Sequence, residues 1–149
     1  MENSYLKFEV IWKDEHMFEI DVLASNGRFK GNCQVYETSN SLLQFAMNLK
    51  GFPDGRENLI HKFGKKDSYS FFEMRFYQIG LTGIVGVQIE MEGNVPSDWR
   101  IEEKEKLIME LIVEPNAVDN FQKELVNLAK TEDGKAELIG IKKHTNNII

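Results

Sequence analysis

The side chains with the greatest chemical reactivity in this sequence are one cysteine and three histidines, and they are widely spaced. The histidines are His16, His61 and His144, and none of them is near Cys33 along the chain. A metal site needs ligands whose spacing lets them converge, and a cysteine nucleophile needs a neighbouring base. We therefore predict that Cys33 is a buried, inert thiol and that there is no metal site. A general base centred on His61 stays open, because active sites assemble in space.

The glycine spacing does not predict a phosphate-binding loop either. Gly80, Gly83 and Gly86 lie close together, but no predicted helix follows them, whereas a nucleotide-binding loop leads into a helix N-terminus. We interpret them as turn and strand glycines. The sequence also lacks the Gly-x-Ser-x-Gly elbow of a hydrolase. We therefore expect a protein that has no catalytic residues, is not an enzyme and has no cofactor.

Acidic residues form the most informative pattern, on a predicted β-hairpin from Ser68 to Glu92. Apolar and polar residues alternate on both sides of a short turn bounded by Gly80 and Gly83, which is typical of a hairpin. Setting these glycines opposite each other predicts the register. One face, expected to be buried, then holds Phe72, Met74, Phe76, Val87, Ile89 and Met91. The other face holds the candidate partner-binding residues Glu73, Arg75, Tyr77, Gln88, Glu90 and Glu92.

The charges on this second face are predicted to be unbalanced. The register sets Glu73 directly opposite Glu90, and like charges in that position cost roughly 0.2–1 kcal/mol. Arg75 is diagonal to Glu90 and offsets part of the repulsion. Two interpretations stay open: a solvated sheet face with one compensating arginine, or a surface that meets a cationic partner. A glycosidase-like carboxylate pair is disfavoured, because a flat hairpin face supplies no cleft.

The composition is that of one globular domain with an acidic balance. The chain has 149 residues, of which 42% are hydrophobic, and 24 acids against 18 bases give a formal charge of −6. A nucleic-acid-binding protein normally presents a basic surface, so we predict no nucleic-acid partner. No apolar run approaches the roughly 20 residues that span a bilayer, and we predict no membrane contact. We expect one domain over residues 1–141, a frayed tail over 142–149 and a cytoplasmic location.

The first part of the chain is predicted to form a meander of three antiparallel strands. Apolar and polar residues alternate over 6–12, 16–24 and 28–37, with turn-forming residues between them. In this pattern Trp12 and Phe29 belong to the inward-facing set. The polar phase of the second strand contains Glu19 and Asp21.

Two amphipathic helices separate the remaining strands. Apolar residues at i, i+3, i+4 and i+7 predict a helix over 39–50, with Thr38 among its N-cap candidates. Pro115 begins the second helix, because proline is tolerated in a first turn. Whether 103–108 is helix or strand stays open. Besides the hairpin, strands are predicted at 58–63, 106–113 and 136–141.

This order of elements predicts an α+β fold. Three strands, a helix, four strands, a second helix and a short last strand suit a largely antiparallel sheet of about six or seven strands. Both helices would pack on one face of that sheet. Two helices of about three turns cannot cover both faces of a large sheet. The second face is therefore either wet or covered by a partner.

Four segments spread over most of the chain carry a family resemblance. They are Phe18-Glu-Ile-Asp-Val, Leu42-Leu-Gln-Phe-Ala with Leu49, Gly83-Ile-Val-Gly-Val-Gln-Ile, and Phe121 with Glu124-Leu125. Together they resemble uncharacterised bacterial α+β domains, some of which look like immunity proteins of polymorphic-toxin systems. The resemblance implies a bacterial, protein-binding chain and no catalytic residues.

Three hypotheses for the function follow. The first is a non-enzymatic, immunity-protein-like module whose acidic sheet face binds a basic protein partner. The alternative is a small-molecule-binding protein or enzyme with a pocket between the first helix and the sheet. The third is an oligomeric module that pairs through an edge strand.

Overall fold

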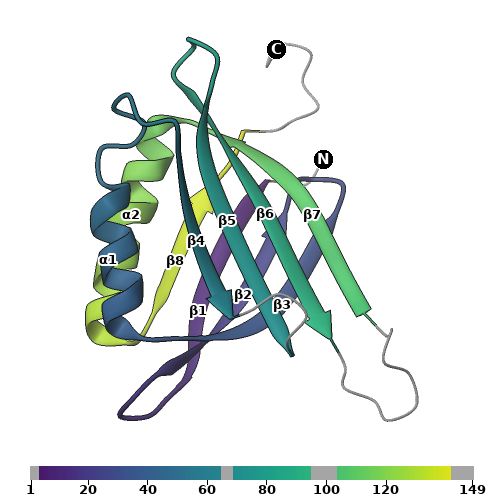
Figure 1. The fold of residues 1–149 in the computed structure, drawn as a ribbon, viewed down its shortest axis with the longest axis vertical. Coiled ribbons are helices and arrows are strands. Elements are labelled where there is room, and N and C mark those ends of the chain that lie inside the picture. The colour runs from purple at the N-terminus through teal and green to yellow at the C-terminus, as the bar shows by residue number, and fades with distance from the viewer. Residues whose placement is uncertain (1–3, 65–68, 95–103, 142–149) are drawn as a thin grey trace.

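The chain forms two four-stranded antiparallel sheets and two α-helices (Figure 1). The computed structural model describes residues 4–64, 69–94 and 104–141. In chain order the elements are β1 (Tyr5–Lys13), β2 (Phe18–Ser25), β3 (Lys30–Glu37), α1 (Ser39–Leu49), β4 (Asn58–Gly64), β5 (Ser70–Ile79), β6 (Ile84–Asn94), β7 (Lys104–Val113), α2 (Pro115–Thr131) and β8 (Lys135–Ile139). The α+β class and the antiparallel pairing are as predicted.

The prediction of one sheet of six or seven strands is wrong, because the strands divide into two sheets. The N-terminal sheet has the order β3-β2-β1-β8, and the hairpin sheet has the order β4-β5-β6-β7. The chain leaves the first sheet through α1 and starts a second one at β4, while β8 returns to pair with β1. Strand periodicity shows which residues share a face, but it does not show which strands become neighbours.

The core lies between the two sheets. Figure 1 shows the hairpin sheet in front of the N-terminal sheet, their strands crossing, and both helices along one side. Phe8 of β1 joins these layers, because its ring meets those of Phe63, Phe72 and Phe121 edge-on at centroid distances of 5.5, 5.7 and 5.6 Å. The helices therefore do not lie on one face of a single sheet, and they close one side of a two-sheet core instead.

The N-terminal meander is confirmed, with two corrections to its predicted inward face. β1, β2 and β3 are adjacent and antiparallel, and Cys33 is buried as expected. Trp12 is 47% exposed, because the β1–β2 register shifts between Val10 and Trp12 and such a bulge changes the side-chain alternation. Phe29 is 60% exposed. It precedes β3 in a turn, where its backbone N–H donates to the Asn26 side chain over 2.9 Å.

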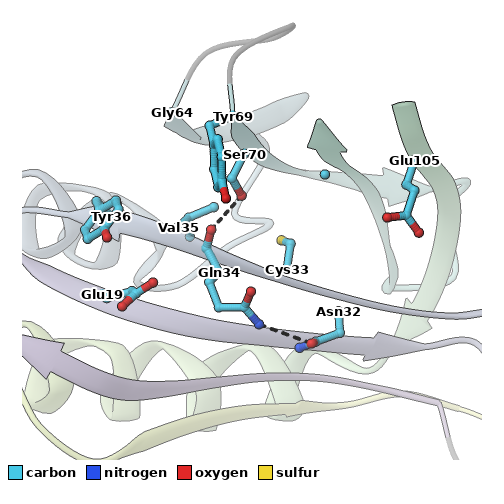
Figure 2. Close-up of a pocket in the computed structure, with 11 residues that line it drawn as sticks. Glu19, Asn32, Cys33, Gln34, Val35, Tyr36, Gly64, Tyr69, Ser70 and Glu105 are labelled. Atoms are coloured by element: carbon cyan, nitrogen blue, oxygen red, sulfur yellow. Dashed lines mark hydrogen bonds between the residues drawn. The ribbon is translucent and has the colours of Figure 1, made fainter. Parts of the chain in front are cut away.

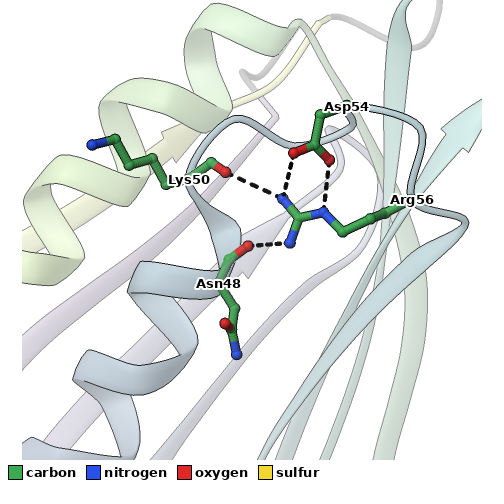
Figure 3. A network of polar contacts seen from close by, with 4 residues as sticks. All are labelled: Asn48, Lys50, Asp54 and Arg56. Carbon is green, nitrogen blue, oxygen red and sulfur yellow. Dashed lines mark hydrogen bonds and ion pairs between the residues drawn. The ribbon is translucent and has the colours of Figure 1, made fainter.

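The first helix begins and ends through contacts from neighbouring residues. Thr38 is its N-cap, as predicted, and its hydroxyl accepts a hydrogen bond from a first-turn N–H. At the other end, Arg56 donates hydrogen bonds to the carbonyl oxygens of Asn48 and Lys50 (Figure 3). Asp54 holds the guanidinium in place through an Nε–Oδ1 contact of 2.7 Å. Arg56 therefore satisfies carbonyls that a helix C-terminus otherwise leaves without a partner.

The second helix packs against the first and begins at Pro115, as predicted. The buried Gln122 side chain donates to the carbonyl of Ala46 over 2.9 Å, which ties the two helices together. Neither helix of the described ranges is long and apolar enough to cross a membrane.

The sequence left open whether residues 103–108 form a helix or a strand. From Lys104 onward they form a strand, β7. Strand candidates 58–63 and 136–141 correspond to β4 and β8. Residue 103 and the predicted tail over 142–149 lie outside the described residues.

Candidate functional site

The β5–β6 hairpin has the predicted register. Its inward pairs are Phe72 with Met91, Met74 with Ile89, and Phe76 with Val87, and all six residues are buried. The six candidate partner-binding residues share the opposite side, the outer face of the hairpin sheet. Glu73 lies opposite Glu90, and Arg75 lies opposite Gln88. The predicted separation of the hairpin into two faces is therefore confirmed.

The adjacent strands supply cations that were not expected on this face. Lys62 of β4 pairs with Glu73 at 3.7 Å, across the strand boundary. Lys106 of β7 lies 3.6 Å from Glu90 and 3.8 Å from Glu92. The prediction of a single compensating cation is therefore wrong. The hairpin by itself does not reveal which strands flank it, so the lysines of β4 and β7 could not be assigned to this face.

A cluster of four side chains spans three strands of the outer face. The Arg75 guanidinium lies over the Tyr77 ring at 4.6 Å from its centroid, and its Nη2 donates to Gln88 over 3.2 Å. The Tyr77 hydroxyl donates to Glu110 of β7. Burial, followed by the hydrogen bond to Glu110, raises the pKa of Tyr77 above its ordinary value, so this hydroxyl stays protonated and acts as a donor.

The Tyr77 ring also covers Gly86, its cross-strand neighbour on β6. A Cβ atom placed on Gly86 would lie only 2.6 Å from Cζ of Tyr77 and closer still to Cε2. The glycine therefore allows the ring to lie flat against the sheet. We interpreted Gly86 as a strand glycine, and this contact gives the physical reason for it.

The outer face combines partly buried polar groups with exposed isoleucines. Glu92 is only 4% exposed and Phe71, its cross-strand partner, only 3%. Ile60 on β4 and Ile108 on β7 are 46% and 51% exposed. In Figure 1 this sheet faces the viewer, and no other described element crosses it. The face is thus mixed in polarity, exposed at Ile60 and Ile108 and buried at Phe71 and Glu92. Its exposed part suits contact with another macromolecule better than enclosure of a small one.

His61 forms a buried contact that the sequence left unassigned. Its Nε2 lies 2.6 Å from Oε2 of Glu37, 24 residues earlier, and the two side chains are 12% and 8% exposed. The imidazole stacks on Phe45 of α1 at 4.7 Å and meets Phe63 edge-on at 4.7 Å. The other Glu37 oxygen accepts from the Thr38 N–H at 2.9 Å. The pair links β3, β4 and α1, and its surroundings are those of a structural contact.

A groove lies away from the hairpin face, along β3 and the strand ends of the hairpin sheet (Figure 2). It encloses about 670 Å³ and is lined by Glu19, Asn32, Cys33, Gln34, Val35, Tyr36, Gly64, Tyr69, Ser70, Gly93 and Glu105. Burial, with the nearby charge of Asp21, raises the pKa of Cys33 to about 12. The thiol is therefore protonated at neutral pH and is a poor nucleophile.

Glu19 and Asp21 belong to this side of the molecule, on the N-terminal sheet, and not to the hairpin face. Asp21 accepts hydrogen bonds from the side chains of Asn32 and Gln34 at 2.9 and 2.7 Å. The structure therefore places the acids of β2 on a different sheet from those of β5 and β6.

The comparisons with known proteins returned no match: no family model, no curated protein and no solved structure is similar to this chain. Within the described ranges, no three histidine, cysteine, aspartate or glutamate side chains gather in a way that could hold a metal ion. Any proposal for the function of this protein therefore depends on the surfaces described above.

Proposed function

We propose that this protein is a non-enzymatic protein-binding module, comparable to an immunity protein, and that it binds through the outer face of the hairpin sheet. The observation that carries the proposal is the cluster of Arg75, Tyr77, Gln88 and Glu110, which is held together by hydrogen bonds and a cation–π contact. Tyrosine and arginine are enriched among the residues that dominate binding energy. Side chains that are already ordered lose little further entropy when a partner binds.

The acidic balance of the chain supports a partner with basic side chains. On the outer face itself the strand register places four acids, Glu73, Glu90, Glu92 and Glu110, and four bases, Lys62, Arg75, Lys104 and Lys106. Lys106 is shared between two of these acids. The whole chain, with this face included, has a formal charge of −6. A basic partner would therefore associate faster at low salt than at high salt.

The exposed isoleucines support a contact that is partly apolar. Ile60 lies beside Arg75, and Ile108 lies beside Glu90, so apolar surface flanks the charged centre on both sides. Protein interfaces combine apolar area with polar groups in this way. A partner that covers both isoleucines would also bury the polar cluster between them.

Charge reversal on the two sheets provides a matched test. The variant E73K/E90K alters the hairpin sheet, and E9K/E137K alters the N-terminal sheet, where each acid is likewise paired with a lysine across a strand boundary. Tagged proteins would be used in pull-downs from the native cell lysate, with far-UV circular dichroism and thermal unfolding as checks on folding. We expect the same partner with the wild type and with E9K/E137K, and loss of it with E73K/E90K. Equal recovery by both variants would contradict the proposal.

The small-molecule alternative gains no support from the region where it was expected. The described side chains between α1 and the sheets are buried and apolar, and they include Leu42, Phe45, Leu49 and Phe76, with the Glu37–His61 pair beside them. These residues pack against one another.

A further inference from the structure

Trp12, Glu19 and Tyr36 form one row across the N-terminal sheet, on the face turned away from the core. The register sets Glu19 of β2 opposite Trp12 of β1 on one side and opposite Tyr36 of β3 on the other. Strands two places apart in a sheet are separated by about 9.5 Å, but the centroids of the Trp12 and Tyr36 rings are only 6.2 Å apart. The two rings therefore lean towards each other across the strand that carries Glu19.

The two rings form a right-angled corner that is open to solvent. The angle between their planes is 89°, and Trp12 and Tyr36 are 47% and 56% exposed. The face of an aromatic ring is electron-rich and attracts cations, and tryptophan does so most strongly. A cation placed in this corner would contact two such faces at once.

The Glu19 carboxylate adds a full negative charge beside the corner. Glu19 is half-buried and lines the 670 Å³ groove together with Tyr36, and Figure 2 shows the two side chains at the same end of that groove. Within the described ranges no lysine or arginine pairs with Glu19, whereas Glu9 on the same face pairs with Lys135 at 3.9 Å. The corner therefore combines two ring faces with a carboxylate that has no cation beside it among the described residues.

The lysines of the adjoining smaller groove are too distant to neutralise this corner. Lys30 and Lys106 line that groove, at the other end of β3. Lys30 precedes Tyr36 by six residues along the strand, which corresponds to roughly 20 Å. Salt screens exposed charges over about 8–10 Å, so these lysines have little effect on a cation beside Glu19.

The charged residues that follow Trp12 and Glu19 along their strands do not oppose a cation either. Lys13 comes directly after Trp12, but it pairs with Phe18, which is buried in the core. Successive residues of a strand point to opposite faces, so Lys13 is directed away from the face that carries the corner. Asp21, the next residue of β2 on that face, is an acid. The potential at the corner is therefore negative.

We propose that the corner of Trp12 and Tyr36, with Glu19 between them, binds a quaternary ammonium group. Such a group has no N–H donor, so ring faces and one carboxylate satisfy it, whereas the ammonium of lysine is strongly hydrated and needs hydrogen-bond acceptors. The same group occurs in small molecules such as choline and on trimethylated lysine side chains. The site is on the N-terminal sheet, and it does not depend on the function proposed for the hairpin sheet.

A matched pair of ligands tests this inference on the unaltered full chain. Choline and 3,3-dimethylbutan-1-ol have nearly the same shape, but only choline is charged. Saturation-transfer NMR on the methyl signal of each ligand measures its affinity. We expect choline to bind at least about 5-fold more tightly, because the contacts of the charge with two rings and a carboxylate are missing in the alcohol. Equal affinities would overturn the proposal, because the corner would then be only an apolar patch.

Variants of the three residues locate the site. W12L and Y36L each remove one ring, and E19Q removes the charge at nearly constant volume. We expect each variant to weaken choline binding by roughly 2- to 5-fold, the range of exposed cation–π contacts and ion pairs. Far-UV circular dichroism and the urea midpoint check that each variant is folded.

The same sheet offers a matched control for each kind of variant. Y5L removes a ring over which the Lys7 ammonium already lies, at 4.7 Å from the centroid. E9Q removes a carboxylate that is paired with Lys135. Both controls are expected to leave the affinity for choline unchanged. If they lost as much affinity as the variants of the corner, net charge or aromatic content alone would explain binding, and the assignment of the site would be wrong.

Peptides distinguish the two sources of the ammonium group. A glycine–serine peptide with one trimethyllysine is compared with choline and with the same peptide carrying unmodified lysine. Tighter binding of the trimethyllysine peptide than of choline would support the site with a methylated protein as its ligand, and equal or weaker binding would support it with a small molecule. Equal affinities of the modified and unmodified peptides would overturn the assignment of a quaternary ammonium group.

Discussion

Removing the contact between His61 and Glu37 should destabilise the fold, because it joins β3 to β4 across the two sheets. Phenylalanine at position 61 preserves a ring that can stack on Phe45 and Phe63, so His61→Phe removes mainly the polar contact. Glu37→Leu removes the other partner at similar volume. The Thr38 N–H loses its carboxylate acceptor in that variant, but Thr38 is exposed and water can replace it.

The magnitude follows from burial and from which group is left without a partner. With both side chains no more than 12% exposed and the contact at 2.6 Å, each single variant leaves a buried polar group unsatisfied, at a cost of about 1–3 kcal/mol. In the double variant both partners are apolar, so its cost should be well below the sum of the two. A double-mutant cycle should therefore give a coupling energy of about 1–3 kcal/mol.

Urea unfolding followed by circular dichroism measures this coupling energy. The free energy of unfolding of the wild type, both single variants and the double variant is extrapolated to zero denaturant. The stability losses of the two single variants add to within about 0.5 kcal/mol when two sites are independent. If the double variant showed such additivity, the view that this pair joins the sheets would be refuted. An H61A variant, which also removes the aromatic stacking, should be less stable than H61F.

Three further predictions concern the end of α1, the hairpin face and the cysteine. Replacing Arg56 by alanine removes the side chain that donates hydrogen bonds to the last carbonyls of α1. This should lower the free energy of unfolding by about 1–2 kcal/mol. An unchanged urea midpoint would contradict this prediction, because it would show that water replaces the arginine fully. Gly86→Ala should displace Tyr77 and cost about 1–3 kcal/mol, with a change in tyrosine fluorescence; an unperturbed spectrum would contradict the contact. Because burial raises the pKa of Cys33 from 9.0 to about 12, its iodoacetamide labelling at pH 8 should be far slower in the folded than in the urea-unfolded protein. The unfolded thiol ionises first as pH rises, so this residue should lower stability between pH 9 and 12, and equal labelling rates would argue against its burial.

Much of the local structure followed from the sequence, because the relevant patterns are short. The alternation around Gly80 and Gly83 predicted the hairpin register, since a slip of one residue would mix apolar with charged side chains. The spacing of apolar residues after Thr38 and the position of Pro115 predicted both helices. These features depend on interactions between near neighbours in the chain.

The candidate site was predictable only in part. The six residues of the hairpin face were assigned correctly to one side, because a single hairpin fixes their alternation. Their charge partners were not, because Lys62 and Lys106 come from strands whose place beside the hairpin depends on the whole sheet. Trp12 was assigned to the wrong face because the β1–β2 register shifts at a bulge beside it. The sequence pattern does not indicate this bulge.

The sequence by itself determined the elements, their amphipathic faces and the pairing within the hairpin. Only the tertiary structure decided that β4 begins a second sheet, that His61 meets Glu37, and that Glu19 and Glu105 line one groove. The physical reason is the range of the interactions. Periodicity records which side of a strand is apolar, whereas contacts between distant segments depend on how all the elements pack together around one core.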